Sequence, residues 1–105
     1  MPYRILWIEF AEEDLDSIYN FYADTKNTKV AINIFNEILD AAETLSDFPQ
    51  KGPVEQELSG LQGEYRYLLV RKHFKIIYYL EEESIFIAAV WDCRQNPQTN
   101  ISKIK

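Results

Sequence analysis

The sequence has 105 residues, the length of one small domain, and we expect a single domain over residues 1–105. Hydrophobic residues make up 47% of the chain, which is enough for a packed core and excludes a disordered protein. The formal net charge of −6 argues against a broad basic surface of the kind that binds free nucleic acid.

A strand and two helices are the first predicted elements. β-Forming residues predict a short strand at Tyr3–Ile8, after which the apolar residues change to a helical period. One helix is predicted over residues 11–25, and its apolar stripe consists of Ala11, Leu15, Ile18 and Tyr22. A second helix is predicted from Thr28, as the N-cap, to about Ser46. Its stripe consists of Ala31, Phe35, Ile38, Leu39, Ala42 and Leu45.

Three strands are predicted in the second half of the chain. The segment "DFPQKGP" ends the second helix, and a polar stretch runs to Gly63. The strands are then expected at Tyr65–Val70, Phe74–Leu80 and Ser84–Cys93, and their short joins predict hairpins. We therefore expect an α+β fold in the order β-α-α-β-β-β. Two N-terminal antiparallel helices pack on one face of a small, mostly antiparallel sheet. The polar tail after about residue 97 is expected to be loosely held.

Positive charge gathers in one segment of this acidic chain. Residues 1–50 hold ten acidic and three basic residues, whereas residues 66–75 hold four basic residues and no acidic one. The four basic residues are Arg66, Arg71, Lys72 and Lys75. The segment therefore predicts a cationic surface, and the simpler alternative for its middle part is a polar hairpin turn.

Two arginines are the main candidates for binding an anion. If Tyr67 and Leu69 pack on the helices, strand alternation places Arg66 on the open face of the sheet. Its forked guanidinium suits a carboxylate or a phosphate, and the alternative is a surface ion pair with a neighbouring strand. Arg94 follows the last predicted strand and lies close to whatever that end of the sheet binds, unless it simply pairs with Asp92.

Few other residues suggest a catalytic, metal-binding or membrane role. His73 is the single histidine, and its ordinary pKa near neutrality suits a general acid or base, the alternative being a solvated turn residue. The single cysteine, Cys93, forms no internal disulfide and fits a reducing cytoplasm. The acids of the first helix lack histidines at metal-binding spacing, so we expect no metal and no other cofactor. No apolar run approaches the roughly 20 residues of a membrane span, so we expect no membrane partner.

Over residues 3–98 the chain resembles the RelE/ParE superfamily of toxins from type II toxin–antitoxin, or plasmid stabilisation, modules. The resemblance rests on the segments "FAEEDLDSIYNFY", "AINIFNEILDAAETLSDFPQKG", "EYRYLLVRKHFKIIYYL" and "IAAVWDCRQNP" in this order. It implies a growth inhibitor that a cognate antitoxin neutralises by wrapping it with a C-terminal segment. A homodimer and a toxin–antitoxin hetero-oligomer are both compatible with it.

The resemblance implies two alternative targets. RelE-like members cut messenger RNA in the ribosome, and here Arg66 and Arg94 match the family arginines that stabilise the phosphate. Lys75 and His73 are the further candidates for that reaction. Such nucleases commonly carry a tyrosine or histidine near the C-terminus, and this chain has neither after Arg94. A ParE-like toxin that acts on DNA gyrase without cleaving RNA is therefore the preferred hypothesis.

An inactive interaction domain with the same fold is the third hypothesis. For a toxin, the expected target-binding and antitoxin-binding residues are the same. They are Arg66, Arg71, Lys72, Lys75 and Arg94.

Overall fold

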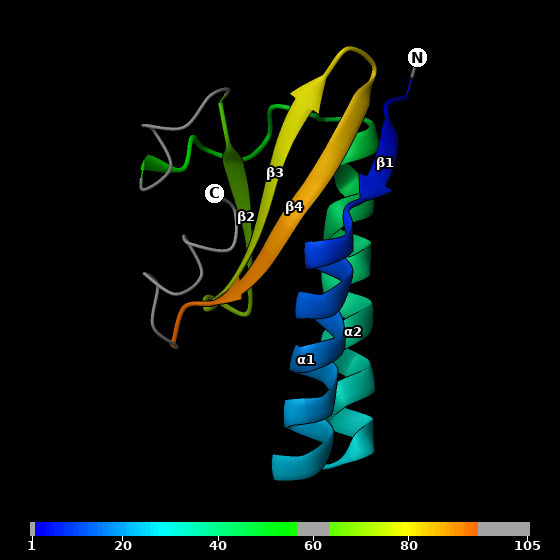
Figure 1. The fold of residues 1–105 in the computed structure, drawn as a ribbon, viewed down its shortest axis with the longest axis vertical. Coiled ribbons are helices and arrows are strands. Elements are labelled where there is room, and N and C mark those ends of the chain that lie inside the picture. Colours follow the sequence, from blue (N-terminus) through cyan, green and yellow to red (C-terminus); the bar gives the residue numbers. More distant parts are fainter. Residues whose placement is uncertain (1, 57–63, 95–105) are drawn as a thin grey trace.

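The computed structural model describes residues 2–56 and 64–94, which form a helical hairpin packed against a sheet (Figure 1). The helices are α1 (Glu9–Thr25) and α2 (Thr28–Glu43), and one short 3₁₀ turn, η1 (Thr44–Ser46), extends the second. The strands are β1 (Arg4–Trp7), β2 (Arg66–Val70), β3 (Phe74–Glu81) and β4 (Ser84–Asp92). The predicted α+β class and the predicted order of elements are confirmed.

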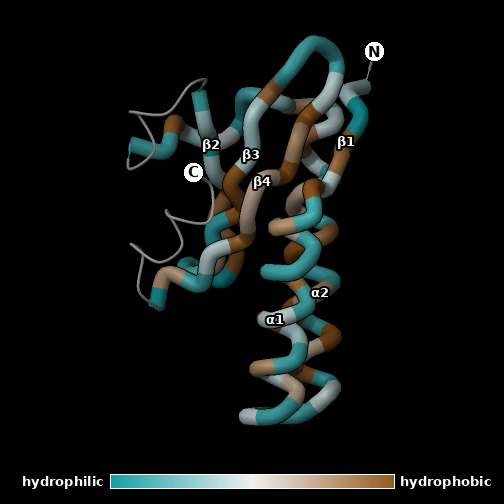
Figure 2. The backbone as a smooth tube through the Cα atoms, in the orientation of Figure 1, coloured by the Kyte–Doolittle hydropathy of each residue, from teal (hydrophilic) through white to brown (hydrophobic). Residues whose placement is uncertain are grey.

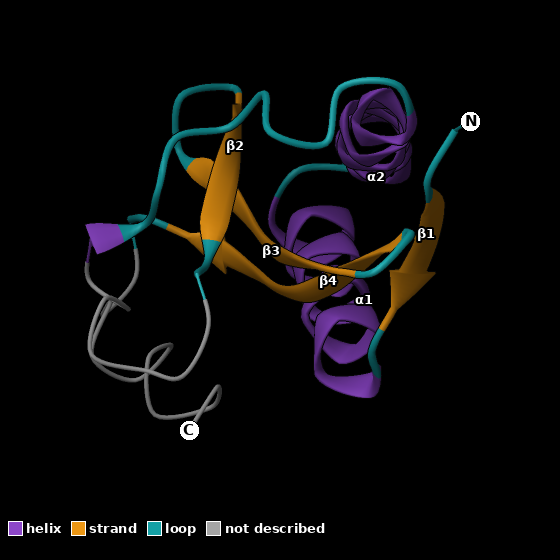
Figure 3. Ribbon diagram, turned by 90° about the horizontal axis from the view of Figure 1, so that it is seen from above, coloured by secondary structure: helices purple, strands orange, loops and turns teal. Residues whose placement is uncertain are grey.

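The four strands form one sheet in the order β1-β4-β3-β2. β3 pairs antiparallel with β2 and with β4, as the short joins predict. β1 pairs with β4 in parallel, with Arg4 opposite Ser84, and the long connection through both helices, β2 and β3 makes this pairing possible. Figure 3, a view along the helices, shows α1 and α2 side by side and the strands strongly twisted relative to one another.

The core lies between the helical hairpin and one face of the sheet. The buried residues of α1 are Ala11, Leu15, Ile18 and Tyr22, which confirms the predicted stripe. On α2, Ile34 is also buried, whereas the predicted core residues Phe35 and Leu39 are half-buried at the margin. Figure 2 shows apolar and hydrophilic positions alternating along both helices. α2 therefore turns a slightly different side to the core than its stripe predicts.

The helices cover the face of the sheet that carries Leu68 and Val70 of β2. Tyr67 packs against a second apolar cluster that lies on the other face, and the side chain of Leu69 is 53% exposed. Because Arg66 alternates with Tyr67, it lies on the same face as Leu68. The predicted open-face position of Arg66 is therefore wrong. Both alternating sets of β2 contain apolar residues, so the sequence pattern did not distinguish the faces.

The N-cap of α2 is Asn27, one residue before the predicted Thr28. The backbone of Asn27 is extended, and its side-chain oxygen accepts a hydrogen bond from the N–H of Val30 at 2.9 Å. This bond satisfies one of the unpaired donors at the start of a helix. Thr28 is the first residue of the helix itself.

The turn between β2 and β3 contains two non-glycine residues in the left-handed region, Arg71 with φ 53° and Lys72 with φ 66°. Side chains in this region crowd the backbone at a cost of roughly 1 kcal/mol each, whereas glycine avoids the cost. We expect Lys72→Gly to raise the free energy of unfolding by about 1 kcal/mol in urea titrations. An unchanged or lower free energy of unfolding would contradict this account of the turn.

Some predictions concern residues that the structure leaves undescribed. The end of the polar stretch before Gly63 and the tail after about residue 97 lie outside the described residues. Within residues 2–56 and 64–94, no helix is both long and apolar enough to cross a bilayer. In the same part of the chain, no three His, Cys, Asp or Glu side chains gather where they could hold a metal ion.

Candidate interaction surface

Four of the five predicted cationic residues form ion pairs, two with acids from distant parts of the chain and two with acids only two residues away. Among the described residues the nitrogen–oxygen distances lie between 2.6 and 3.3 Å. The pairs are Arg66–Glu64, Arg71–Glu37, Lys75–Glu55 and Arg94–Asp92. Lys72 is exposed in the turn and has no ion-pair partner among these residues. The segment is therefore much less cationic in the folded protein than its own sequence indicates.

Arg66 holds the loop that follows α2 and η1. Its guanidinium donates to the carbonyl of Gly52 at 2.8 Å, and Glu64 takes a second hydrogen bond. The N–H of Gly52 in turn donates to the hydroxyl of Tyr78 at 3.0 Å. Burial raises the pKa of Tyr78 above its ordinary value, and the Gly52 bond and nearby Arg66 partly oppose this shift. The contribution of the neutral Tyr78 hydroxyl to the free energy of unfolding is therefore complete below pH about 10. It is lost as the pH rises further, because the hydroxyl then ionises more readily in the unfolded chain.

Lys75 and Glu55 form a pair on the sheet face that the helices leave uncovered. The ammonium lies 2.6 Å from the Glu55 carboxylate, whose side chain is 3% exposed. It also lies 4.5 Å from the centre of the Tyr67 ring, a favourable cation–π position. Glu55 further donates its N–H to the carbonyl of Tyr65. The loop after α2 is thus fastened to β2 and β3 on both sides of the sheet.

Arg71 connects the β2–β3 turn to α2. Its guanidinium donates two hydrogen bonds to Glu37, at 2.9 and 2.7 Å. This bonding lowers the pKa of Glu37, so its contribution to stability is present at neutral pH and is lost as the pH falls through the lowered value. Both side chains are exposed, so the pair contributes only about 0.5 kcal/mol.

Arg94 lies beside a small pocket near the β2–β3 turn, away from Arg66. Asp92 is buried there, and it accepts hydrogen bonds from the Tyr22 hydroxyl and from Arg94. The guanidinium lies 5.5 Å from the centre of the Tyr22 ring and remains 55% exposed. The pocket has a volume of about 440 Å³, and its lining consists of Phe21, Tyr22, Thr25, Lys26, Asp92 and Arg94. Arg94 is therefore the predicted arginine that stays most accessible.

His73 lies near Arg94 and away from Arg66. Its carbonyl accepts a hydrogen bond from the N–H of Cys93, so the β2–β3 turn and the end of β4 are adjacent. The imidazole packs on Phe74, and its Nε2 is buried without a hydrogen-bond partner in the described part of the chain. The structure thus brings together Arg71, Lys72, His73 and Arg94 at one end of the sheet. Arg66 lies away from them, at the start of β2 and opposite Tyr78 in the middle of β3.

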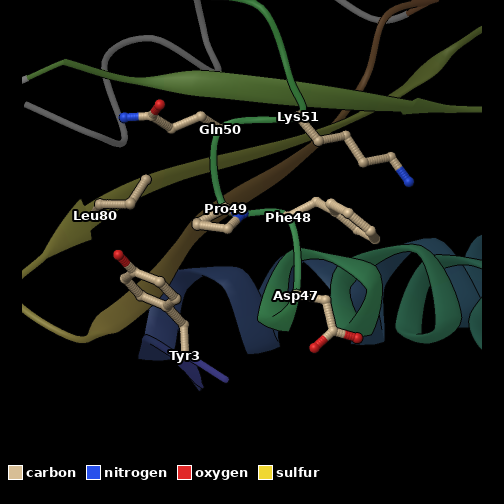
Figure 4. A pocket seen from close by; sticks show the side chains of 7 residues that line it. All are labelled: Tyr3, Asp47, Phe48, Pro49, Gln50, Lys51 and Leu80. Atoms are coloured by element: carbon tan, nitrogen blue, oxygen red, sulfur yellow. The ribbon is translucent and has the colours of Figure 1, made fainter. Parts of the chain in front are cut away.

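Sequence reasoning missed an apolar pocket beside the loop after α2. It has a volume of about 700 Å³, and Figure 4 shows its lining of Tyr3, Asp47, Phe48, Pro49, Gln50, Lys51 and Leu80. The side chain of Phe48 is 65% exposed. A phenylalanine inside the loop "DFPQK" was the available signal, because loops between helices and strands are usually polar.

The described residues form a small α+β fold whose surface carries paired charges and apolar pockets. A family model described as "ParE toxin of type II toxin-antitoxin system, parDE" matches residues 5–97. The chain belongs to this family of toxins, and the resemblance to the RelE/ParE superfamily is confirmed.

One solved structure has a similar fold. The structure titled "Chromosomal ParDE TA system from P. aeruginosa" is similar, with a TM-score of 0.72. The match covers 86% of this chain and 95% of that chain at 21% identity, which shows a shared fold. A comparison with curated protein sequences finds no significant match.

Proposed function

We propose that this protein is the toxin of a toxin–antitoxin pair in the cytoplasm and that it arrests growth by acting on DNA gyrase. A cognate antitoxin binds and neutralises it. Membership in the ParE toxin family is the observation that carries this proposal. The similar structure, whose title names a ParDE system, supports an antitoxin as the partner.

The arrangement of the candidate residues favours a toxin that does not cleave RNA. A ribonuclease needs a base, an acid and phosphate-stabilising cations around one reacting phosphate. Arg66 lies at the start of β2 and Arg94 lies near the opposite end of that strand, and each guanidinium is held by a carboxylate of its own chain. His73 Nε2 is buried, so it is poorly placed to exchange a proton with a substrate.

Two assays on the purified protein separate the possible targets. The protein is expected to inhibit supercoiling by gyrase and to leave a reporter messenger RNA intact on programmed ribosomes. Cleavage of the reporter with normal supercoiling would replace the gyrase target by the ribosome. Normal growth on expression without an antitoxin would instead favour the inactive interaction domain.

We expect Arg94→Gln to relieve growth arrest, because it removes the accessible guanidinium and leaves an amide donor near Asp92. The melting temperature should fall by less than about 5 °C, which separates lost binding from lost folding. Arg4→Gln, at an exposed arginine on β1, is the matched control and should leave growth arrest intact. Full growth arrest by the Arg94 variant would remove this residue from the target surface.

A further inference from the structure

The two helices leave an apolar pocket open near the end of β1. We call it the hairpin pocket, and its volume is about 280 Å³. Its lining consists of Trp7, Glu12, Leu15, Asp16, Phe35 and Leu39. The residues come from the end of β1, the first turns of α1 and the middle of α2. The pocket belongs to none of the surfaces that hold Arg66 or Arg94.

The walls of the hairpin pocket are apolar side chains that the fold does not cover completely. Phe35 and Leu39 are half-buried, because the core side of α2 is centred on Ile34 and Ile38 instead. Trp7 is half-buried as well. Half-covered aromatic and aliphatic side chains around a cavity are the usual receptor for one large apolar side chain of a partner.

Two exposed acids line the pocket. Glu12 and Asp16 are exposed and four residues apart on α1, where their like charges repel. Neither has an ion-pair partner among residues 2–56 and 64–94, whereas Glu37, Glu55 and Asp92 each hold a cation. Lysine or arginine from another molecule would relieve this repulsion.

We propose that the hairpin pocket binds a partner-protein segment that carries one large apolar side chain flanked by lysine or arginine. The apolar side chain fills the space between Trp7, Phe35 and Leu39, and the flanking cations reach Glu12 and Asp16. The exposed carboxylates repel nucleic acid phosphates and anionic lipid headgroups, which leaves a basic peptide segment as the fitting occupant. This site is independent of the target proposed above, since it uses neither arginine.

A peptide titration followed by tryptophan fluorescence tests the proposal on the intact chain. The probe is a short alanine-based peptide with one phenylalanine flanked by lysines. Its comparison peptides carry glutamate in place of lysine, or alanine in place of phenylalanine. Trp7 lines the pocket and Trp91 is 2% exposed, so binding should change the Trp7 emission. We expect this change to disappear in Trp7→Phe and binding to weaken with added salt.

Charge variants distinguish binding of the peptide at the pocket from nonspecific attraction to the acidic protein. Glu12→Gln combined with Asp16→Asn should weaken binding of the lysine peptide about tenfold. Glu81→Gln combined with Glu82→Gln removes the same charge at the β3–β4 turn and should leave affinity unchanged. Equal affinity for the lysine and glutamate peptides would overturn the proposal. So would equal weakening by the two double variants, or tight binding of the peptide that lacks phenylalanine.

Discussion

We expect Gly52→Ala to lower the free energy of unfolding by about 3 kcal/mol. A Cβ atom at this position would lie 2.1 Å from the carbonyl oxygen and 2.9 Å from the carbonyl carbon of Tyr67. Both atoms belong to the backbone of β2, so relief requires the loop or the strand to move. Such movement also weakens the hydrogen bonds that Gly52 makes with Arg66 and Tyr78.

Thermal unfolding is a direct measurement of this effect. The expected loss corresponds to a melting temperature lower by about 15 °C. Lys51→Ala, at the exposed neighbouring residue, is the control and should change stability by less than about 0.5 kcal/mol. A Gly52 variant as stable as the Lys51 variant would show that the loop does not approach β2 this closely.

The second large effect is expected at the buried Lys75–Glu55 pair. Lys75→Met should lower the free energy of unfolding by about 3 kcal/mol, because the carboxylate of Glu55 stays buried without this cation. Glu55→Met should cost less, since the long side chain of Lys75 is 20% exposed and can reach water. Urea unfolding of both single variants measures this asymmetry.

The double variant isolates the pair itself. Replacing both residues with methionine removes the buried charge and keeps side-chain volume, so stability should return to within about 1 kcal/mol of the original. Additive losses in the double variant would contradict the explanation. They would mean that each side chain contributes through packing and not through the ion pair.

These two predictions assign a structural role to part of the predicted cationic segment. Arg66 and Lys75 fasten the loop after α2 from opposite faces of the sheet. That loop carries Phe48 and lines the pocket of about 700 Å³. Loss of toxicity on replacing Arg66 or Lys75 would therefore need a stability measurement before a target contact is inferred. Arg94 lies on the surface and does not hold this loop. A loss of toxicity on replacing Arg94 is therefore easier to assign to a lost target contact.

Local sequence signals predicted the elements well. The helical stripe at Ala11, Leu15, Ile18 and Tyr22 is buried as predicted, because helical period is a property of a short segment. The β2–β3 and β3–β4 hairpins follow from short joins in the same way. Parallel pairing of β1 with β4 joins segments about eighty residues apart, and no local pattern indicates it.

The surface was less predictable than the fold. The cationic segment contains no acid, yet Glu37 lies 34 positions from Arg71 and Glu55 lies 20 positions from Lys75. Counting charges in a window cannot include acids that folding brings from elsewhere. The face that Arg66 occupies was also undetermined, because Tyr67 and Leu68 are both suited to a core.

The helices, the strands, the α+β class and the family could be inferred from the sequence alone, because these depend on local periodicity and on the order of segments. The folded structure was needed to show which face of β2 is covered, which acids neutralise which cations, and where apolar pockets remain open. Those features depend on distances between segments far apart in the chain, and electrostatic and packing energies act through these distances. The charge that a partner meets is therefore set by the folded surface.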